Sequence, residues 1–383
     1  MDNQKENKRE LRIFSLASFL NDMGSDIIYP IWPLFVTVFL GADVLILGII
    51  DGIGDALVSI SSALSGYLSD KFRKRKIFIW TGYLSSGIAR FGYSIVPTWI
   101  YLIPFKVLDR AGKIRASQRD AMIAELSTKE NRGTNFGFLR AMDNFGAIVG
   151  ITLSIIFLKY LGFRNLILLA SIPSFFSVLI IYFFIKEKKF EPQKRYFSIN
   201  LFDRNFRLFV IVNGIFALGA FSYSFFLLYA KDIGFSIYTV PIFYLIFTVS
   251  STIFSYPFGK MADKIGRKKV LMISYFSFAL ACISLIFTRN FIGILGIFFI
   301  YGLHKAAIDV SQKTLASEIC PFDYRATSLG YFQLVTGLMA FPASFIAGIL
   351  WKILGMNYPL YLSSTLALTA FILINLVKEK KVC

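Results

Sequence analysis

Four aspartates lie in predominantly apolar stretches near the start of the chain, in two pairs of equal spacing. Asp22 and Asp26 form one pair, Asp51 and Asp55 form the other, and the members of each pair are four residues apart. In a helix this spacing places both carboxylates on one face. An ionised side chain within a membrane costs about 2.5–3.5 kcal/mol on insertion scales, so it usually serves a function or has a partner. The chemistry that we expect here is the loading and release of a proton.

Further charged side chains follow in apolar stretches of the first half. They are Arg90, Asp109, Arg110, Lys113, Arg140 and Asp143. Asp109 is a further proton-site candidate, and the cations could neutralise the acids or hold an anionic group of a solute. A structural interpretation competes with this one, because Asp109 with Lys113 and Arg140 with Asp143 have the spacing of pairs within one helix. The sequence does not single out one acid.

The elements that must position these residues are membrane-spanning helices. The chain has 383 residues, of which 56% are hydrophobic and 42 are Phe, and its mean hydropathy is +0.63. Long apolar runs that follow one another closely are typical of an all-α polytopic membrane protein. The net charge of +18 does not indicate nucleic-acid binding, because Lys and Arg gather in the cytoplasmic loops of membrane proteins.

Several classes of chemistry are not expected. The three cysteines and the single histidine show no metal-ligand spacing, which argues against a metal site. The sequence also shows no glycine-rich phosphate loop and no nucleophile elbow. We therefore expect no cofactor, no metal and no enzymatic activity.

Twelve spans are predicted from runs of about 20 mostly apolar residues. They lie at about 12–40, 44–68, 77–97, 99–121, 133–158, 164–185, 207–230, 238–258, 269–288, 290–313, 325–351 and 357–377. Residues 1–190 are expected to form one six-helix bundle and residues 207–383 a second, joined by a basic cytoplasmic linker at 191–206. Because this arrangement places most Lys and Arg in the inner loops, both termini are expected on the cytoplasmic side.

A basic hairpin occurs twice, between predicted spans two and three and between spans eight and nine. Its two copies are GYLSDKFRKRK at 66–76 and GKMADKIGRKK at 259–269, which are 193 residues apart. Glu125 and Glu318 have the same offset. Repeats at one offset indicate two pseudo-symmetric bundles in parallel orientation.

The two hairpins resemble the signature of the major facilitator superfamily (MFS), which is roughly G-x-x-x-D-[RK]-x-G-[RK]-[RK]. The second copy fits throughout, whereas the first has Arg73 where the family usually has glycine. The matching positions are Gly66, Asp70, Arg73, Gly259, Asp263, Gly266 and Arg267. The resemblance implies that these residues help to latch one conformation. The alternative is that the basic runs only keep the loops on the inner side. The stretch from Asp109 to Ala121 also resembles a prokaryotic branch of the superfamily.

The resemblance implies a secondary transporter that exposes a central site to each side of the membrane in turn. At the offset of 193, the four acids of the first two spans fall on Ile215, Gly219, Tyr244 and Thr248. Acids confined to one half indicate a coupling or binding site, so we expect proton-coupled transport of a small solute. The alternatives are a passive facilitator, a flippase for a lipid-like substrate, and a membrane sensor that does not transport.

The remaining expectations concern partners and location. The partners are an unidentified small-molecule substrate and the lipid bilayer, with no nucleic acid, and the protein is expected to be a monomer in the cell membrane. Drug exporters of the superfamily commonly carry Gly-Pro-x-x-Gly-Gly in helix five. Here Gly146 and Gly150 stand at that position without the proline, which weakens the assignment as an exporter. Close helix packing is the simpler interpretation of the glycines.

Overall fold

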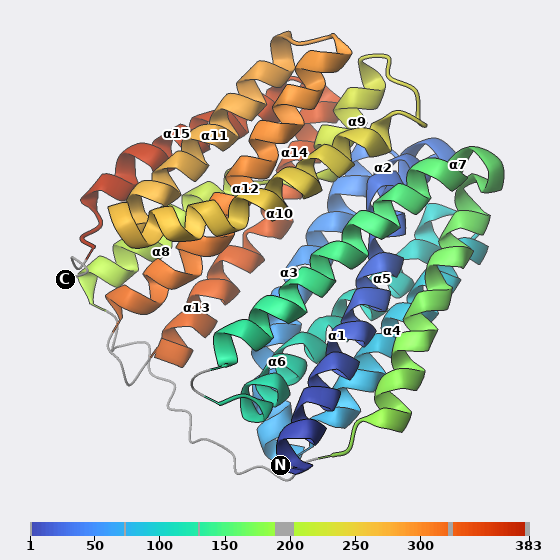
Figure 1. The fold of residues 1–383 in the computed structure, drawn as a ribbon. Coiled ribbons are helices and arrows are strands. Elements are labelled where there is room, and N and C mark those ends of the chain that lie inside the picture. The colour runs from blue at the N-terminus through green and yellow to red at the C-terminus, as the bar shows by residue number, and fades with distance from the viewer. Residues whose placement is uncertain (1, 73, 129–130, 188–202, 321–324, 380–383) are drawn as a thin grey trace. The chain divides into compact units, whose positions relative to one another are not determined.

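The computed structural model of the chain describes residues 2–72, 74–128, 131–187, 203–320 and 325–379. Helices make up nearly all of this described part, and no strand occurs in it (Figure 1). The predicted all-helical class is therefore confirmed.

The chain divides into two compact units. Unit 1 comprises Met1–Ala42 and Leu57–Gln193, and unit 2 comprises Asp43–Ala56 and Lys194–Cys383. The long helix α3 (Val44–Phe72) contributes its first part to unit 2 and its remainder to unit 1. Of the predicted linker at 191–206, residues 191–202 lie outside the described part.

Unit 1 is built from helices that are repeatedly interrupted. In chain order they are α1 (Asp2–Ile28), η1 (Tyr29–Ile31), α2 (Trp32–Leu34), η2 (Phe35–Phe39), α4 (Lys76–Ile95), η3 (Trp99–Tyr101), α5 (Leu102–Ala111), η4 (Gly112–Ile114), α6 (Arg115–Leu126) and α7 (Arg132–Phe184). The predicted single span at 12–40 is interrupted at Tyr29, where Pro30 and Pro33 follow. Proline lacks the N–H group that a regular helix needs, which accounts for the irregular geometry there.

Helices α1 and α4 both lie against α7. Gly146 and Gly150 make the contact between α1 and α7 possible, because a Cβ atom on either residue would collide with a carbonyl oxygen of α1. The oxygens belong to Phe19 and Met23, on the part of α1 that carries Asp22 and Asp26. The glycine pair therefore serves close helix packing, as the sequence suggested.

The described helices account for twelve spans. Eight stretches are long and apolar enough to cross a membrane by length and composition. One of them, α7, has 53 residues and is interrupted at Gly162, whose φ is 67°; Figure 1 shows its two parts running in opposite directions. The α1–η2 stretch, α4, and the α5–α6 stretch supply the other three spans. All three contain buried charged residues.

Unit 2 contains the start of α3 and the helices of the second half of the chain. These are α8 (Arg204–Gly219), α9 (Ser224–Asp232), α10 (Val240–Ile265), α11 (Arg267–Phe287), α12 (Phe291–Ile319), α13 (Arg325–Leu338), α14 (Ala340–Leu354), α15 (Tyr358–Leu373) and η7 (Ile374–Leu376). Aromatic rings fill much of its interior, and His304 is buried among them, 4.8 Å from the ring of Phe278. Its Nδ1 atom lies 2.8 Å from Ser274 Oγ, so it is a buried polar partner within the core.

Candidate functional site

The second hairpin copy forms a compact charged cluster at the start of α11. Arg267 lies 2.7 Å from Asp263 and 3.1 Å from Glu318, so one guanidinium joins the ends of α10 and α12. The N–H group of Arg267 donates a hydrogen bond of 2.5 Å to Glu379. Gly266 has a φ of 97°, and a Cβ atom there would lie 2.7 Å from the same carboxylate. The glycine of the motif thus permits Glu379 to reach the N-terminus of α11.

The first hairpin copy makes a matching cluster at the start of α4. Arg73 lies outside the described residues, and Gly66 and Asp70 belong to α3. Arg75 forms an ion pair with Glu125, and its N–H group donates a hydrogen bond of 2.8 Å to Glu187. In each unit, one glutamate thus forms an ion pair with the side chain of the hairpin arginine. A second glutamate accepts a hydrogen bond from the backbone N–H group of the same arginine.

Sequence reasoning missed Glu187 and Glu379. Both stand in a short Lys-Glu-Lys-Lys run, at 186–189 and at 378–381, directly after the sixth and twelfth spans. The repeat of this run after the last span of each half could have identified both glutamates from the sequence. A carboxylate at a helix N-terminus satisfies free N–H groups and interacts favourably with the helix dipole.

A small polar cavity lies within unit 1, where α1, η1, α2, α4 and α5 meet. It has a volume of about 20 Å³ and is lined by Ser25, Ile28, Tyr29, Trp32, Arg90, Tyr93, Lys106, Asp109 and Arg110. Three of the predicted site residues, Arg90, Asp109 and Arg110, are therefore brought together. Trp32, Tyr93 and Lys106 also line this cavity.

Arg90 is held in this cavity by neutral oxygen atoms. Its guanidinium donates hydrogen bonds to the carbonyl oxygen of Asn21 at 2.9 Å and to Ser25 Oγ at 2.5 Å. It also donates to Ser174 Oγ on α7. Only 2% of Arg90 is exposed, and none of the ion pairs between described residues involves it. Its position is thus fixed by neutral oxygen atoms of three residues.

Asp109 lies 3.8 Å from Arg110, its neighbour in the chain. The helix tightens to a 3₁₀ turn over Gly112–Ile114, so Lys113 stands in an irregular part of this span. The pairing of Asp109 with Lys113 stays a prediction.

Asp143 and Arg140 belong to an ionic network away from the cavity. Arg140 lies 3.4 Å from Asp143 on the same helix and 3.3 Å from Asp120 on α6. Asp143 also accepts a hydrogen bond of 2.5 Å from Ser18, and Arg119 is 3.7 Å away. The structural interpretation of this pair accounts for the contacts, because the network joins α1, α6 and α7.

Asp26 is the exception among the buried acids of unit 1. It is 8% exposed, and within the described part of the chain its carboxylate forms no hydrogen bond and no ion pair. Asp22, by contrast, accepts a hydrogen bond of 3.0 Å from Asn21. The charges that act on the Asp26 carboxylate are those of Asp22, Lys113 and Arg90. Burial without a partner is an unusual state for a carboxylate.

The second pair of predicted acids belongs to unit 2. Asp51 is 4% exposed and accepts a hydrogen bond of 2.8 Å from Ser222. Asp55 lies one turn further along α3 and is half-buried. The same part of α3 packs tightly on α14, since a Cβ atom on Gly48 would collide with the carbonyl oxygen of Ser344. Asp51 therefore has a structural partner.

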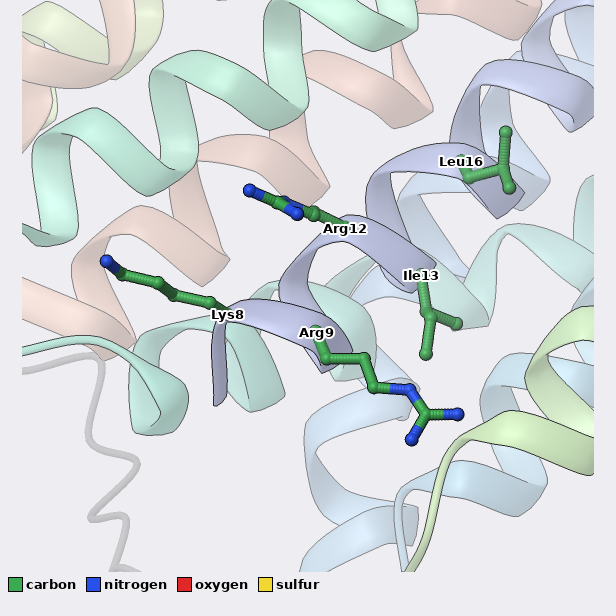
Figure 2. Close-up of a pocket in the computed structure, with 5 residues that line it drawn as sticks. All are labelled: Lys8, Arg9, Arg12, Ile13 and Leu16. Carbon is green, nitrogen blue, oxygen red and sulfur yellow. The ribbon is translucent and has the colours of Figure 1, made fainter. Parts of the chain in front are cut away.

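A second hollow lies along the first turns of α1 and has a volume of about 460 Å³. Figure 2 shows its lining residues Lys8, Arg9, Arg12, Ile13 and Leu16, with Lys8 and Arg12 projecting to one side of the helix. All five belong to a single helix. We interpret it as an open basic surface of α1 and not as an enclosed binding site.

Comparison with known proteins identifies the class. The model of the Major Facilitator Superfamily matches residues 14–249 and 209–382. The chain therefore belongs to this superfamily; it is a multi-pass membrane protein and a transporter, not an enzyme.

Two curated relatives cover most of the chain. An MFS-type transporter of Methanocaldococcus jannaschii, MJ1317, is 36% identical over 92% of this chain and 91% of its own length. The multi-drug resistance efflux pump PmrA of Streptococcus pneumoniae is 26% identical over 82% of each chain.

Solved structures agree on the fold. The nucleoside transporter NupG matches with a TM-score of 0.82 and 15% identity, covering 96% of this chain and 100% of that one. A POT family transporter in complex with a thioalcohol-conjugated peptide matches with a TM-score of 0.83 and 13% identity, covering 96% of both chains. At this level of identity the likeness concerns the fold alone.

Proposed function

We propose that the protein is a secondary active transporter that moves a small solute together with protons by alternating access. The observation that carries this proposal is the buried Asp26, whose carboxylate has no hydrogen-bond or ion-pair partner among the described residues. An ionised carboxylate in such a place is costly, and either a proton or entering water removes that cost. Its charge state is thus linked to the side from which water reaches it.

The other predicted acids support this choice by contrast. Asp109 lies near Arg110, Asp143 near Arg140, and Asp51 accepts a hydrogen bond from Ser222. Partners of this kind stabilise one charge state, so these acids are less suited to exchanging a proton in each cycle. In our proposal these three acids stabilise the folded structure, and Asp26 carries the proton.

The hairpins have a separate role in the proposal. We assign the clusters around Arg75 and Arg267 to latching one conformation, because each joins several helix ends within its own unit and so stabilises one arrangement of those ends. The positive charge of both hairpins and of the start of α1 favours the cytoplasmic side. We therefore propose that both termini are cytoplasmic, that the protein resides in the plasma membrane, and that it acts as a monomer.

The test is transport in liposomes that contain the purified protein. A panel of labelled carboxylates, nucleosides, amino acids and cationic dyes is offered with and without an imposed pH gradient. We expect one class to accumulate only with the gradient. Asp26→Asn should abolish this accumulation but retain solute exchange without a gradient, while Asp309→Asn, an exposed acid of unit 2, should behave as the wild type. Gradient-independent movement in the wild type would favour a facilitator and contradict proton coupling.

Drug export is the second candidate function. It is favoured by the likeness to the efflux pump PmrA over 82% of the chain. The missing proline beside Gly146 argues against it. The dyes in the panel test this candidate directly, because an exporter should move them against their gradient from the cytoplasmic side.

A further inference from the structure

The cavity of unit 1 has an excess of positive charge. Its charged lining residues are Arg90, Lys106, Asp109 and Arg110, and each of them is at most 8% exposed. Three cations thus face one carboxylate in a place with little water. Buried charge of one sign is expected to attract an opposite charge.

Two of these cations contact aromatic side chains that also line the cavity. The Lys106 ammonium lies 3.9 Å from the ring centre of Trp32, and Arg110 donates a hydrogen bond of 3.2 Å to the Tyr29 hydroxyl. Arg90 is fixed by the oxygens of Asn21, Ser25 and Ser174. All of these contacts are with neutral groups. They hold the cations in place without reducing the net positive charge of the cavity lining.

Tyr93 supplies an independent indication that a ligand is bound. It lines the cavity, is 3% exposed, and packs on Trp32 with 5.1 Å between ring centres. Its hydroxyl group has no hydrogen-bond partner within the described part of the chain. Buried polar groups are nearly always hydrogen-bonded, so a donor in this position calls for an acceptor.

The cavity has room for one compact group. About 20 Å³ suffices for a water-sized group, which is one carboxylate oxygen or a single halide ion. We propose that this cavity binds an anionic group and that the transported solute carries a carboxylate, whose remainder lies outside the cavity. This inference rests on the transport function proposed above and names its substrate class.

The position of Asp26 links the anion to the proton. Asp26 follows Ser25, whose hydroxyl accepts a hydrogen bond from Arg90. When Asp26 is ionised it offsets part of the positive charge near Arg90, and when it is protonated it does not. Proton and anion binding therefore favour each other, which is the requirement for carrying both in the same direction.

The test is binding to the purified full-length protein in detergent, without a membrane or a gradient. Sodium lactate is titrated against lactamide, its neutral counterpart, and against sodium chloride at equal ionic strength. The readout is tryptophan fluorescence together with the midpoint of thermal unfolding. We expect a saturable response to lactate that is absent with lactamide and that disappears in Trp32→Phe but remains in Trp351→Phe.

Substitutions locate the site. Lys106→Gln should weaken lactate binding about tenfold to a hundredfold, as expected for a contact with a charged donor. Tyr93→Phe should weaken it by a smaller factor, and Lys305→Gln, an exposed lysine of unit 2, should have no effect. An unchanged response in Lys106→Gln and Tyr93→Phe would overturn the proposal, as would the absence of any saturable lactate response.

The two sources of anion give different results. A response to chloride alone would identify an inorganic anion site and overturn the assignment of a carboxylate solute. Failure of this test is distinguishable from failure of proton coupling, because binding is measured here on the wild-type cavity and coupling by the gradient dependence of flux in Asp26→Asn.

Discussion

The carboxylate of Glu379 accepts a hydrogen bond of 2.5 Å from the backbone N–H group of Arg267, the first residue of α11. Glu187 has the same relation to Arg75 in unit 1, at 2.8 Å. In both units the acid belongs to the residues directly after the last span. It connects the end of that unit to the start of α4 in unit 1 and of α11 in unit 2. The hairpin signature thus has a partner that its own sequence pattern does not contain.

The first prediction concerns this cap. Glu379→Ala leaves the free N–H groups at the start of α11 without an acceptor. We expect a loss of stability of about 1 kcal/mol, the usual value of an N-terminal cap. Thermal unfolding of the purified protein measures it, with Glu187→Ala expected to match it and Glu379→Gln to show a smaller loss. Equal stability of all four proteins would contradict the role of the cap.

The second prediction concerns the latch. Asp263→Asn removes one carboxylate from Arg267 and retains Glu318. Because the Asp263 side chain is 71% exposed, folding stability should hardly change. Transport rate should fall if the pair stabilises one conformation of the cycle. The matched control is Asp309→Asn, which removes an exposed pair of the same spacing with Lys305. Wild-type rates in Asp263→Asn would remove the latch from the account.

The third prediction concerns the packing of α1 on α7. Gly150→Ala places a Cβ atom against the carbonyl oxygen of Met23 and should destabilise the protein by about 1–3 kcal/mol. Gly137→Ala is the control on the same helix, because open space surrounds Gly137 and alanine favours helix. Thermal unfolding of both variants decides the matter. A similar midpoint for both would show that the close approach is absent.

The fourth prediction concerns pH. Asp43 lies 3.0 Å from Lys352. Partial burial raises the pKa of Asp43, but the Leu45 N–H group and Lys352 outweigh it, and the pKa lies below the ordinary 3.8. A lowered pKa stabilises the folded state above the ordinary value, and this contribution is lost as the pH falls through the lowered one. Wild type should therefore exceed Asp43→Asn in unfolding midpoint at pH 6, with the small difference shrinking below about pH 4. A difference that does not change with pH would contradict this.

The repeated hairpin was sufficient to predict the fold. Asp263 and Arg267 stand in a pattern that needs only local spacing, and the long apolar runs between the hairpins define the spans by length. Interruptions were harder to predict, because Gly112–Ile114 tightens for reasons that spacing does not contain.

The choice among the acids could not be made from the sequence. Asp26 and Asp51 each have a second aspartate four residues away. They differ in what other helices bring to them: Ser222 for Asp51, and no hydrogen-bonding or ionic partner among the described residues for Asp26. The periodicity of a sequence does not predict tertiary contacts of this kind. Lys106 was not chosen as a site residue for the same reason.

The central claim is that Asp26 carries the coupled proton, and solute accumulation driven by a pH gradient tests it most directly. Liposomes with wild-type protein or Asp26→Asn receive the same labelled carboxylate and the same gradient. The account predicts accumulation above the external concentration in the wild type and only equilibration in Asp26→Asn, with exchange retained in both. Accumulation of equal size in both proteins would contradict it.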